Sequence, residues 1–356
     1  VAFSIILFSG GMDTKFKDIK PILGPGVVLS TLGVLLTTLF TGLFIYGISH
    51  AFSHVIQIPL TFALLLAATM SSTDSASVFN ILRSQKMGLR NKLQPMLEFE
   101  SGSNDPMAYM LTIVMIQIIQ GGETTNVDAW RIIFNFLIQF GFGLIFGYLL
   151  GRGCVWIINK INLQNKSLYP ILMLSFIFFV FSFTNLFNGN GYLAVYVAGI
   201  VMGNSKLTEN KSINSFLDGV TWLVQIVMFL VLGMLVNPND MFKIALPALI
   251  VGVFVILVGR PLSVFLCLLP FKDIEKKSKL FVSWVGLRGA APIIFATYPV
   301  VEGVPGATFI FNMVFFITLT SLIIQGTSIT KVADMLKLSV IKDDGPENFG
   351  VDIPEE

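Results

Sequence analysis

Charged residues are scarce in this chain. Only 12% of its 356 residues are charged, whereas soluble domains carry about 25%. Hydrophobic residues make up 54%, and the mean hydropathy is +0.80. The net charge of +2 is too small to favour a nucleic-acid partner. No G-x-x-x-x-G-K-[ST] phosphate loop occurs, which argues against an ATP-driven step within this chain, and we expect no cofactor. The composition predicts an all-α polytopic membrane protein.

Cysteine and histidine are equally sparse. Cys154 and Cys267 are far apart in the sequence and show no metal-ligand spacing, so we expect both to pack in the interior. His50 and His54 lie near the end of one apolar segment, where surface positions are favoured over a pH-sensing role. Glycines recur instead, and the small-xxx-small row of Gly143, Gly147 and Gly151 predicts close helix packing.

Apolar segments follow one another along the chain, each long enough, or nearly so, to span a bilayer at 1.5 Å per residue. We place them at 1–12, 24–49, 58–82, 95–119, 131–158, 168–187, 191–203, 216–236, 242–270, 280–300 and 306–327. The first is too short to span, so we expect it to be the tail of a longer helix. We therefore predict a membrane domain over 1–342 and a polar, acidic cytoplasmic tail over 343–356.

Lysine and arginine residues are concentrated in every second loop between the apolar segments. Of the 23 such residues, Arg131 and Lys243 fall in loops on one side, and Arg260 and Arg288 fall inside apolar segments. The others fall in loops on the opposite side, which is cytoplasmic by the positive-inside rule. A wrong count of segments would scramble this alternation, so it supports the segment boundaries as well as the orientation.

Two segments are interrupted by polar and small residues, at 71–77 and at 286–292. Irregular backbone at membrane depth is tolerated only where it lines a cavity or is buried in protein. Each interruption lies in the middle member of a three-helix set, 24–119 or 242–327, and the two sets begin on opposite sides. This arrangement predicts an inverted-repeat fold with two interrupted, crossing helices at the bilayer midplane, which points to a transporter site.

The stretch Glu98-Phe-Glu-Ser-Gly-Ser-Asn-Asp-Pro-Met107 places charges at the start of a long apolar run. A charge at the bilayer centre costs roughly 2.5–3.5 kcal/mol on insertion scales, so this cluster predicts a functional site. Asp105, Asp74 and Arg288 each lie roughly 13–15 Å along a helix from the cytoplasmic end. In a hydrocarbon core about 30 Å thick, we expect the three to meet near the midplane.

Helical phase separates two faces of this segment. Ser101 lies four residues before Asp105 and shares its face, as does Glu98. We therefore predict a cation site at Asp105 with Ser101. Glu98 either lines the cytoplasmic entrance or snorkels to the membrane surface. Asp74 is expected at the site too, with a helix-capping role as the alternative.

The opposite face presents Glu100, about 140° from Asp105, together with Asn104 four residues later. We expect Glu100 to form a buried structural ion pair with Arg288, because a guanidinium cannot lose its proton to escape burial. Asn104 then has a structural influence on the site. Arg260, which precedes Pro261, has no assigned partner.

Oxygen ligands of this kind suit a small hard cation such as Na⁺ or K⁺. Because burial disfavours the charged form of a carboxylate, Asp105 can hold a proton or a metal cation, but not both. Such competition, at a site open to each side in turn, gives cation–proton exchange. The alternatives are an intramembrane aspartyl protease built on Asp74 and Asp105, whose expected Gly-x-Gly-Asp context is absent, and a cation channel.

Four motifs resemble the NhaP-type cation:proton antiporters of the monovalent cation:proton antiporter 1 family. They are Ser72-Thr-Asp-Ser-Ala-Ser-Val78, the stretch 98–107, Trp222-Leu-Val-Gln-Ile-Val-Met228 and Val285-Gly-Leu-Arg-Gly-Ala-Ala-Pro-Ile293. The second and fourth are similar to the potassium/proton or cell-volume-regulation subgroup. The family often has Pro after the Thr-Asp pair, where this chain has Ser75.

The resemblance implies a thirteen-helix homodimer with a core domain (24–119 and 242–327) and a dimer scaffold, in the bacterial cytoplasmic membrane. It also implies that the first helices are missing from this chain, and that a cytoplasmic regulatory domain or nucleotide regulator lies outside it. Carried over residue by residue, Asp105 binds cation and proton, and Asn104 completes a pair associated with electroneutral exchange. Thr73, Asp74 and Ser101 contribute to the cation site, and Glu100 pairs with Arg288.

Overall fold

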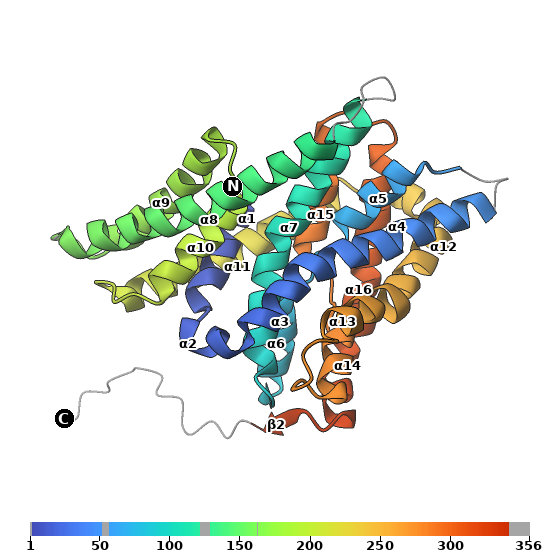
Figure 1. The fold of residues 1–356 in the computed structure, drawn as a ribbon. Helices are drawn as coiled ribbons and strands as arrows, with labels where there is room; N and C mark the ends of the chain where they lie inside the picture. Colours follow the sequence, from blue (N-terminus) through green and yellow to red (C-terminus); the bar gives the residue numbers. More distant parts are fainter. Residues whose placement is uncertain (1, 52–56, 122–128, 162, 342–356) are drawn as a thin grey trace.

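The computed structural model describes residues 2–51, 57–121, 129–161 and 163–341, which fold almost entirely into helices (Figure 1). In chain order the helices are α1 (Ala2–Asp13), α2 (Phe16–Ile19), η1 (Lys20–Ile22), α3 (Leu23–Val28), η2 (Leu29–Gly33), α4 (Val34–Ala51), α5 (Leu60–Thr69), α6 (Ser75–Ser84), α7 (Leu93–Gly121), α8 (Ala129–Lys160), α9 (Leu168–Leu186), α10 (Gly191–Gly203), α11 (Asn210–Met234), α12 (Pro238–Phe254), η3 (Val255–Gly259), α13 (Arg260–Cys267), α14 (Lys276–Trp284), α15 (Ala290–Val301) and α16 (Ala307–Met335).

Every predicted apolar segment falls on one helix or on a run of consecutive helices. Within the residues that the structure describes, six stretches are long and apolar enough to cross a membrane: Phe16–Ala51, Ile133–Lys160, Leu168–Leu186, Asn210–Met234, Pro238–Cys267 and Ala307–Met335. Helix α7 has 29 residues but is not among them, because its polar and charged side chains lower its hydropathy. The segment with the candidate site is therefore the long helix that is least suited to lipid contact.

Both predicted interruptions are present. Helix α5 ends at Thr69 and α6 begins at Ser75, while α14 ends at Trp284 and α15 begins at Ala290. The non-helical residues between them are 70–74 and 285–289. Each break begins one residue earlier than predicted and ends three residues earlier, because the second half-helix already starts within the run of small residues.

The two three-helix sets resemble one another in detail. In each, the first helix contains a five-residue π-helical stretch, η2 in one set and η3 in the other. In each, the third helix, α7 or α16, has 29 residues. π-Helical turns within α-helices often mark functional sites. We refer to these two sets together as the repeat helices.

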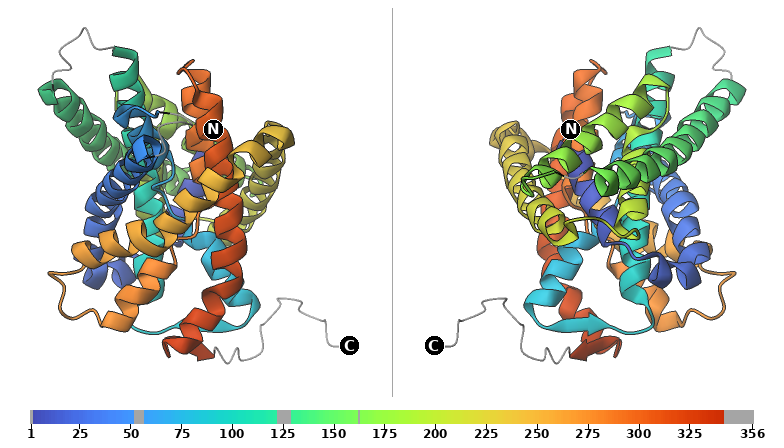
Figure 2. Two further views of the ribbon diagram at one scale, coloured as in Figure 1. Left: turned by 90° about the vertical axis from the view of Figure 1, so that its right-hand side faces the viewer. Right: turned by 90° about the vertical axis from the view of Figure 1, so that its left-hand side faces the viewer.

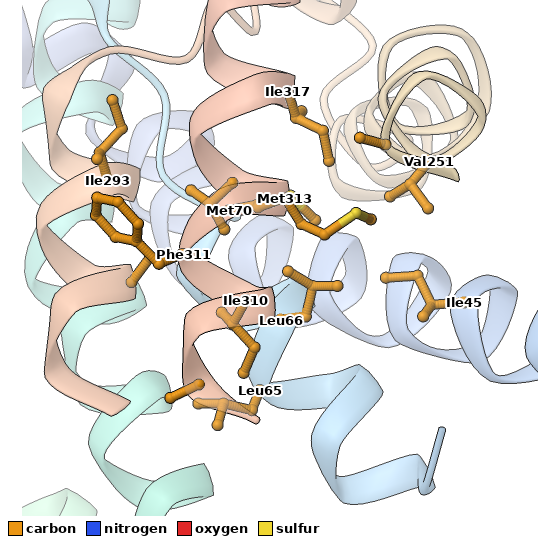
Figure 3. Close-up of a cluster of buried hydrophobic side chains, with 14 of the residues drawn as sticks. Ile45, Leu65, Leu66, Met70, Val251, Ile293, Ile310, Phe311, Met313 and Ile317 are labelled. Atoms are coloured by element: carbon orange, nitrogen blue, oxygen red, sulfur yellow. The ribbon is translucent and has the colours of Figure 1, made fainter. Parts of the chain in front are cut away.

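A buried apolar cluster joins members of the two sets around α16 (Figure 3). Ile310, Met313 and Ile317 of α16 lie among Leu66 of α5 and Val251 of α12. Because lipid tails are as apolar as these side chains, close packing rather than escape from water stabilises such a cluster in a membrane.

Helices α1 and α8–α11 form a second group that we call the α10 bundle, because α10 packs closely against both α8 and α1 (Figures 1 and 2). The predicted role of the glycine row is confirmed: a Cβ on Gly147 would lie 2.6 Å from the carbonyl oxygen of Ala194. On the other side of α10, a Cβ on Gly11 would lie 2.5 Å from the carbonyl oxygen of Tyr196. Backbone contacts on two sides make α10 a fixed element of this bundle.

A short two-stranded ribbon was not anticipated. Strand β1 (Met87–Leu89), between α6 and α7, pairs antiparallel with β2 (Ser339–Ile341), which follows α16. Three-residue strands give too little alternation to be recognised in a sequence. The ribbon ties the connection beside the first interruption to the chain that leaves the last helix.

The remaining expectations fall on individual residues. Cys154 and Cys267 are buried and unpaired, as predicted. His50 is exposed, and its Nδ1 lies 3.0 Å from the carbonyl oxygen of Tyr46. His54 and the predicted tail 343–356 lie outside the described residues.

Candidate functional site

Asp105 lies in the first half of α7, and only 8% of its surface is exposed. Its Oδ1 accepts a hydrogen bond from the hydroxyl of Ser72, a completely buried residue in the first interruption. The sequence reasoning did not name Ser72 as a site residue. The available signal was its place at the start of the first matched motif.

Two further side chains of α7 hold the first interruption in place. The Ser101 hydroxyl donates to the carbonyl oxygen of Thr73 (2.9 Å) and accepts from the backbone N–H of Ser75 (3.0 Å). The amide of Asn104 donates to the Thr73 hydroxyl (2.6 Å). Asn104 therefore contacts the interruption rather than the Asp105 carboxylate, and it reaches the site through Thr73.

Asp74 ends the first interruption. Its carboxylate accepts hydrogen bonds from the backbone N–H of Ser77 (3.2 Å) and from the Ser77 hydroxyl (2.7 Å), which is the geometry of a helix N-cap for α6. The carboxylate also packs against Gly289 of the second interruption, where an added Cβ would lie 2.6 Å from the Cγ of Asp74. Only glycine at 289 leaves room for this contact.

The two interruptions are directly bonded to one another. The backbone N–H of Asp74 donates to the carbonyl oxygen of Leu287 (2.8 Å), and the Arg288 guanidinium donates to the carbonyl oxygen of Ser72 (2.6 Å). The non-helical backbone of each segment thus supplies partners for the other. Ser72 links Arg288 to Asp105, since its carbonyl contacts one and its hydroxyl the other.

The predicted ion pair between Glu100 and Arg288 is wrong. Glu100 pairs instead with Arg260, with 2.5 Å between Oε1 and Nη2, and both residues are at most 2% exposed. The stem of Arg260 crosses Gly286, where a Cβ would lie 3.1 Å from its Cγ. Both arginines are buried, and spacing along the sequence cannot show which of the two side chains reaches Glu100.

Helix α16 holds the second interruption as α7 holds the first. The Ser321 hydroxyl accepts from the backbone N–H of Arg288 (3.0 Å) and donates to Oε1 of Gln325 (2.5 Å). The Gln325 amide donates to the carbonyl oxygen of Trp284 (2.6 Å). Neither residue was predicted. Their spacing of four along an apolar helix was the signal that could have indicated a buried polar pair.

A cavity of about 230 Å³ reaches Asp105. Asp74, Ser75 and Ser101 also line it. The cavity therefore brings together three of the four predicted cation-binding residues, namely Asp105, Asp74 and Ser101. Thr73, the fourth, is not among the lining residues, since its carbonyl and hydroxyl oxygens face Ser101 and Asn104. The cavity wall thus combines two carboxylates with hydroxyl oxygens.

A second chamber of about 620 Å³ adjoins the first. Glu98 lines both, so the structure places it where the chambers meet. We call this second chamber the outer chamber, because it lies farther from Asp105 than the first. The charged residues around it are Asp13, Lys15, Asp18, Glu98 and Asp218. An excess of carboxylates in a cleft raises the local concentration of cations. The arrangement can therefore attract a small cation and pass it to a buried carboxylate.

Structural repeats with interrupted helices at their interface are typical of secondary transporters. The family model described as sodium/hydrogen exchanger, transmembrane, matches residues 1–334. The chain therefore belongs to the sodium/hydrogen exchanger family.

Relatives and solved structures agree with this membership. The chain is 40% identical over 340 residues to the K(+)/H(+) antiporter NhaP2 of Shewanella sp. (strain MR-4), covering 96% of this chain and 57% of the relative. It is 42% identical to the K(+)/H(+) antiporter NhaP of Alkalimonas amylolytica over 347 residues, 98% of this chain and 58% of the relative. The chain thus spans little more than half the length of these relatives.

The solved structure of the sodium proton antiporter MjNhaP1 from Methanocaldococcus jannaschii has the same fold. The TM-score is 0.80 over 94% of this chain and 84% of that chain, at 21% identity. The all-helical antiporter fold predicted from the sequence is thereby confirmed.

Proposed function

We propose that this protein exchanges a monovalent cation, K⁺ or Na⁺, for H⁺ by alternating access, with electroneutral stoichiometry. The observation that supports this most strongly is the position of Asp105. It is a nearly buried carboxylate that lines the inner end of a two-chamber path. A carboxylate in this position can accept a cation from the path or hold a proton in its place.

Each site residue then has a distinct role. Asp105 binds cation and proton in turn, and Asp74 and Ser101 supply further oxygen ligands from the cavity wall. Asn104 and Thr73 hold the first interruption in shape. Glu98 lies at the cytoplasmic entrance. The Glu100–Arg260 pair and Arg288 fix the protein around the site.

The α10 bundle and the repeat helices suit the two roles that alternating access requires. The repeat helices, about 24–119 and 242–327, form the moving core. The α10 bundle contributes to the scaffold of a homodimer in the bacterial cytoplasmic membrane. The Lys- and Arg-rich loops and the tail 343–356 face the cytoplasm, with a regulatory domain or nucleotide regulator acting from outside this chain. The two relatives named K(+)/H(+) antiporters favour K⁺ as the cation.

The hydrogen bonds between Asp74 and Ser77 do not favour the protease alternative. Both of its carboxylate oxygens accept hydrogen bonds from Ser77 and cap α6. A protease needs both aspartates free to activate water between them. A channel could use the same cavity, so geometry does not distinguish it from an antiporter. The two differ in whether cation movement is coupled to proton movement.

Exchange in proteoliposomes tests the proposal. An imposed K⁺ or Na⁺ gradient should drive proton movement in the opposite direction in the parent protein. Asp105→Asn should abolish that movement while the protein still purifies as a folded species. Asp334→Asn, at an exposed position of α16, is the matched control and should retain exchange. Full activity in Asp105→Asn, or cation flux with no coupled proton movement, would overturn the proposal.

A further inference from the structure

The side of Asp105 opposite the two chambers is closed by aromatic rings. Helix α7 begins near the outer chamber, which Gln94 and Pro95 line, so residues after Asp105 lead away from it. One turn beyond Asp105, the ring of Tyr109 packs edge-on against Tyr192 of α10 (centroids 4.9 Å apart) and Tyr298 of α15 (5.2 Å). Phe3 of α1 adds a further ring contact to Tyr192 (5.3 Å).

Two hydrogen bonds join α10 to the repeat helices at this closed side. The hydroxyl groups of Tyr192 and Tyr298 lie 2.9 Å apart. The Asn190 amide donates to the carbonyl oxygen of Pro106 (3.1 Å), the residue directly after Asp105. Both bonds therefore end within the helix of the site or in the half-helix that follows the second interruption.

Asn190 is itself fixed to the α10 bundle. Its backbone N–H donates to the carbonyl oxygen of Gln139 in α8 (2.9 Å), and its Oδ1 caps α10 by accepting from the N–H of Leu193 (3.1 Å). It is 1% exposed. With its other polar groups committed to α8 and α10, its amide is a rigid attachment point for α7.

We propose that Asn190 and Tyr192 form a latch that holds the side of the site away from the two chambers closed, and that both bonds must break for that side to open. The proposal rests on the proposed function, because a carrier that exchanges ions needs a second state in which α7 has moved relative to α10. The latch consists of two neutral hydrogen bonds, so only a modest free energy is needed to break it and open this side. A purely apolar seal of the same rings would lack the directional bonds to Pro106 and Tyr298.

The latch can be weakened without removing the structure around it. Tyr192→Phe and Tyr298→Phe keep the rings and remove the hydroxyl bond. Asn190→Ser keeps an N-cap for α10 but is too short to reach Pro106. Tyr169→Phe is the control, because it removes only hydroxyl bonds within the α10 bundle, one to the Ile161 carbonyl (2.7 Å) and one from the Leu163 N–H (3.3 Å). Gel filtration verifies that each variant remains folded.

The measurement is the rate at which a membrane-impermeant maleimide, added to the outer face of right-side-out vesicles, labels Ala108→Cys. Ala108 is completely buried in the same cluster as Tyr192 and Phe295. The native cysteines are replaced by alanine. A neutral hydrogen bond contributes about a fivefold factor to a two-state population. We therefore expect roughly fivefold faster labelling in Tyr192→Phe, Tyr298→Phe and Asn190→Ser.

Tyr192→Phe combined with Tyr298→Phe should label no faster than either alone, since both remove the same bond. Adding Asn190→Ser should multiply the rate. Labelling at the parent rate in all latch variants would overturn the proposal, as would equal acceleration in Tyr169→Phe. Labelling does not depend on transport. A parent protein with no exchange but with these labelling differences would therefore overturn the proposed function and leave the latch standing, and the reverse result would overturn the latch alone.

Discussion

At the scale of single residues, the site is a set of polar groups that are nearly all committed to one another. Ser72 is the centre of this set, because its hydroxyl holds Asp105 and its carbonyl accepts from Arg288. The consequence is that Asp105 sits at the edge of a rigid network rather than in a flexible loop. A proton or cation that arrives there meets a carboxylate whose position is already fixed.

The ion pair between Glu100 and Arg260 can be tested against the alternative pairing of Glu100 with Arg288. Removing one partner of a buried ion pair costs about 3–5 kcal/mol, because the other charge is left unpaired. Arg260→Met should therefore lower the yield of folded protein and its unfolding temperature in detergent. Adding Glu100→Gln should recover most of that loss, since no unpaired charge then remains.

The same rescue should fail with the other arginine. Arg288→Met loses the bond to the Ser72 carbonyl, and Glu100→Gln cannot replace it. Recovery in the Arg288→Met background, with none in the Arg260→Met background, would show that Glu100 pairs with Arg288 after all.

The helical phase of α7 predicted which face carries Glu100 but not which arginine pairs with it. It correctly placed Glu100 on a different face of α7 from Asp105, because phase within one helix follows from spacing alone. It could not choose between Arg260 and Arg288, because that choice depends on the contact between Arg260 and Gly286 across two chain segments. The spacing of Ser321 and Gln325 could have indicated that they bond to each other, but their bonds to Arg288 and Trp284 depend on how α16 packs against the second interruption.

At the scale of elements, each repeat holds its own interruption with its third helix. Ser101 and Asn104 of α7 bond to residues 73–75, and Ser321 and Gln325 of α16 bond to Arg288 and Trp284. Interrupted backbone in a membrane needs such partners, because lipid supplies none. The two sets thus meet the same physical requirement with different residues.

Ser321→Ala tests this function of α16. The substitution leaves the buried N–H of Arg288 without a partner, which costs about 1–3 kcal/mol. We expect a lower unfolding temperature in detergent. Thr327→Ala is the control, because that hydroxyl bonds only within its own helix at an exposed position. Equal stability of the two variants would show that the serine does not support the interruption.

At the scale of the whole molecule, hydropathy predicted the order of the helical segments and the two interruptions. This succeeds because a membrane leaves few ways to satisfy the backbone. The β1–β2 ribbon was not predicted, because it joins segments about 250 residues apart through three-residue strands. The π-helical stretches and the latch contacts were also beyond the sequence, since each depends on how helices pack.

The overall arrangement leaves one side of Asp105 open to two chambers and the other closed by the tyrosine rings, where α7 contacts both α10 and α15. This arrangement matches one of the two states that the proposed alternating access would require. We propose that in this state a proton and a cation exclude one another at Asp105.

Proton release on cation binding measures this competition directly. Purified protein in weakly buffered detergent solution is titrated with KCl or NaCl, with choline chloride as the control for ionic strength, while pH is recorded. Where Asp105 is protonated, each bound cation should displace a proton, and the release should vanish at higher pH, where no proton is left to displace. Asp105→Asn should release none. Cation binding without proton release at every pH, or equal release from Asp105→Asn, would contradict the account.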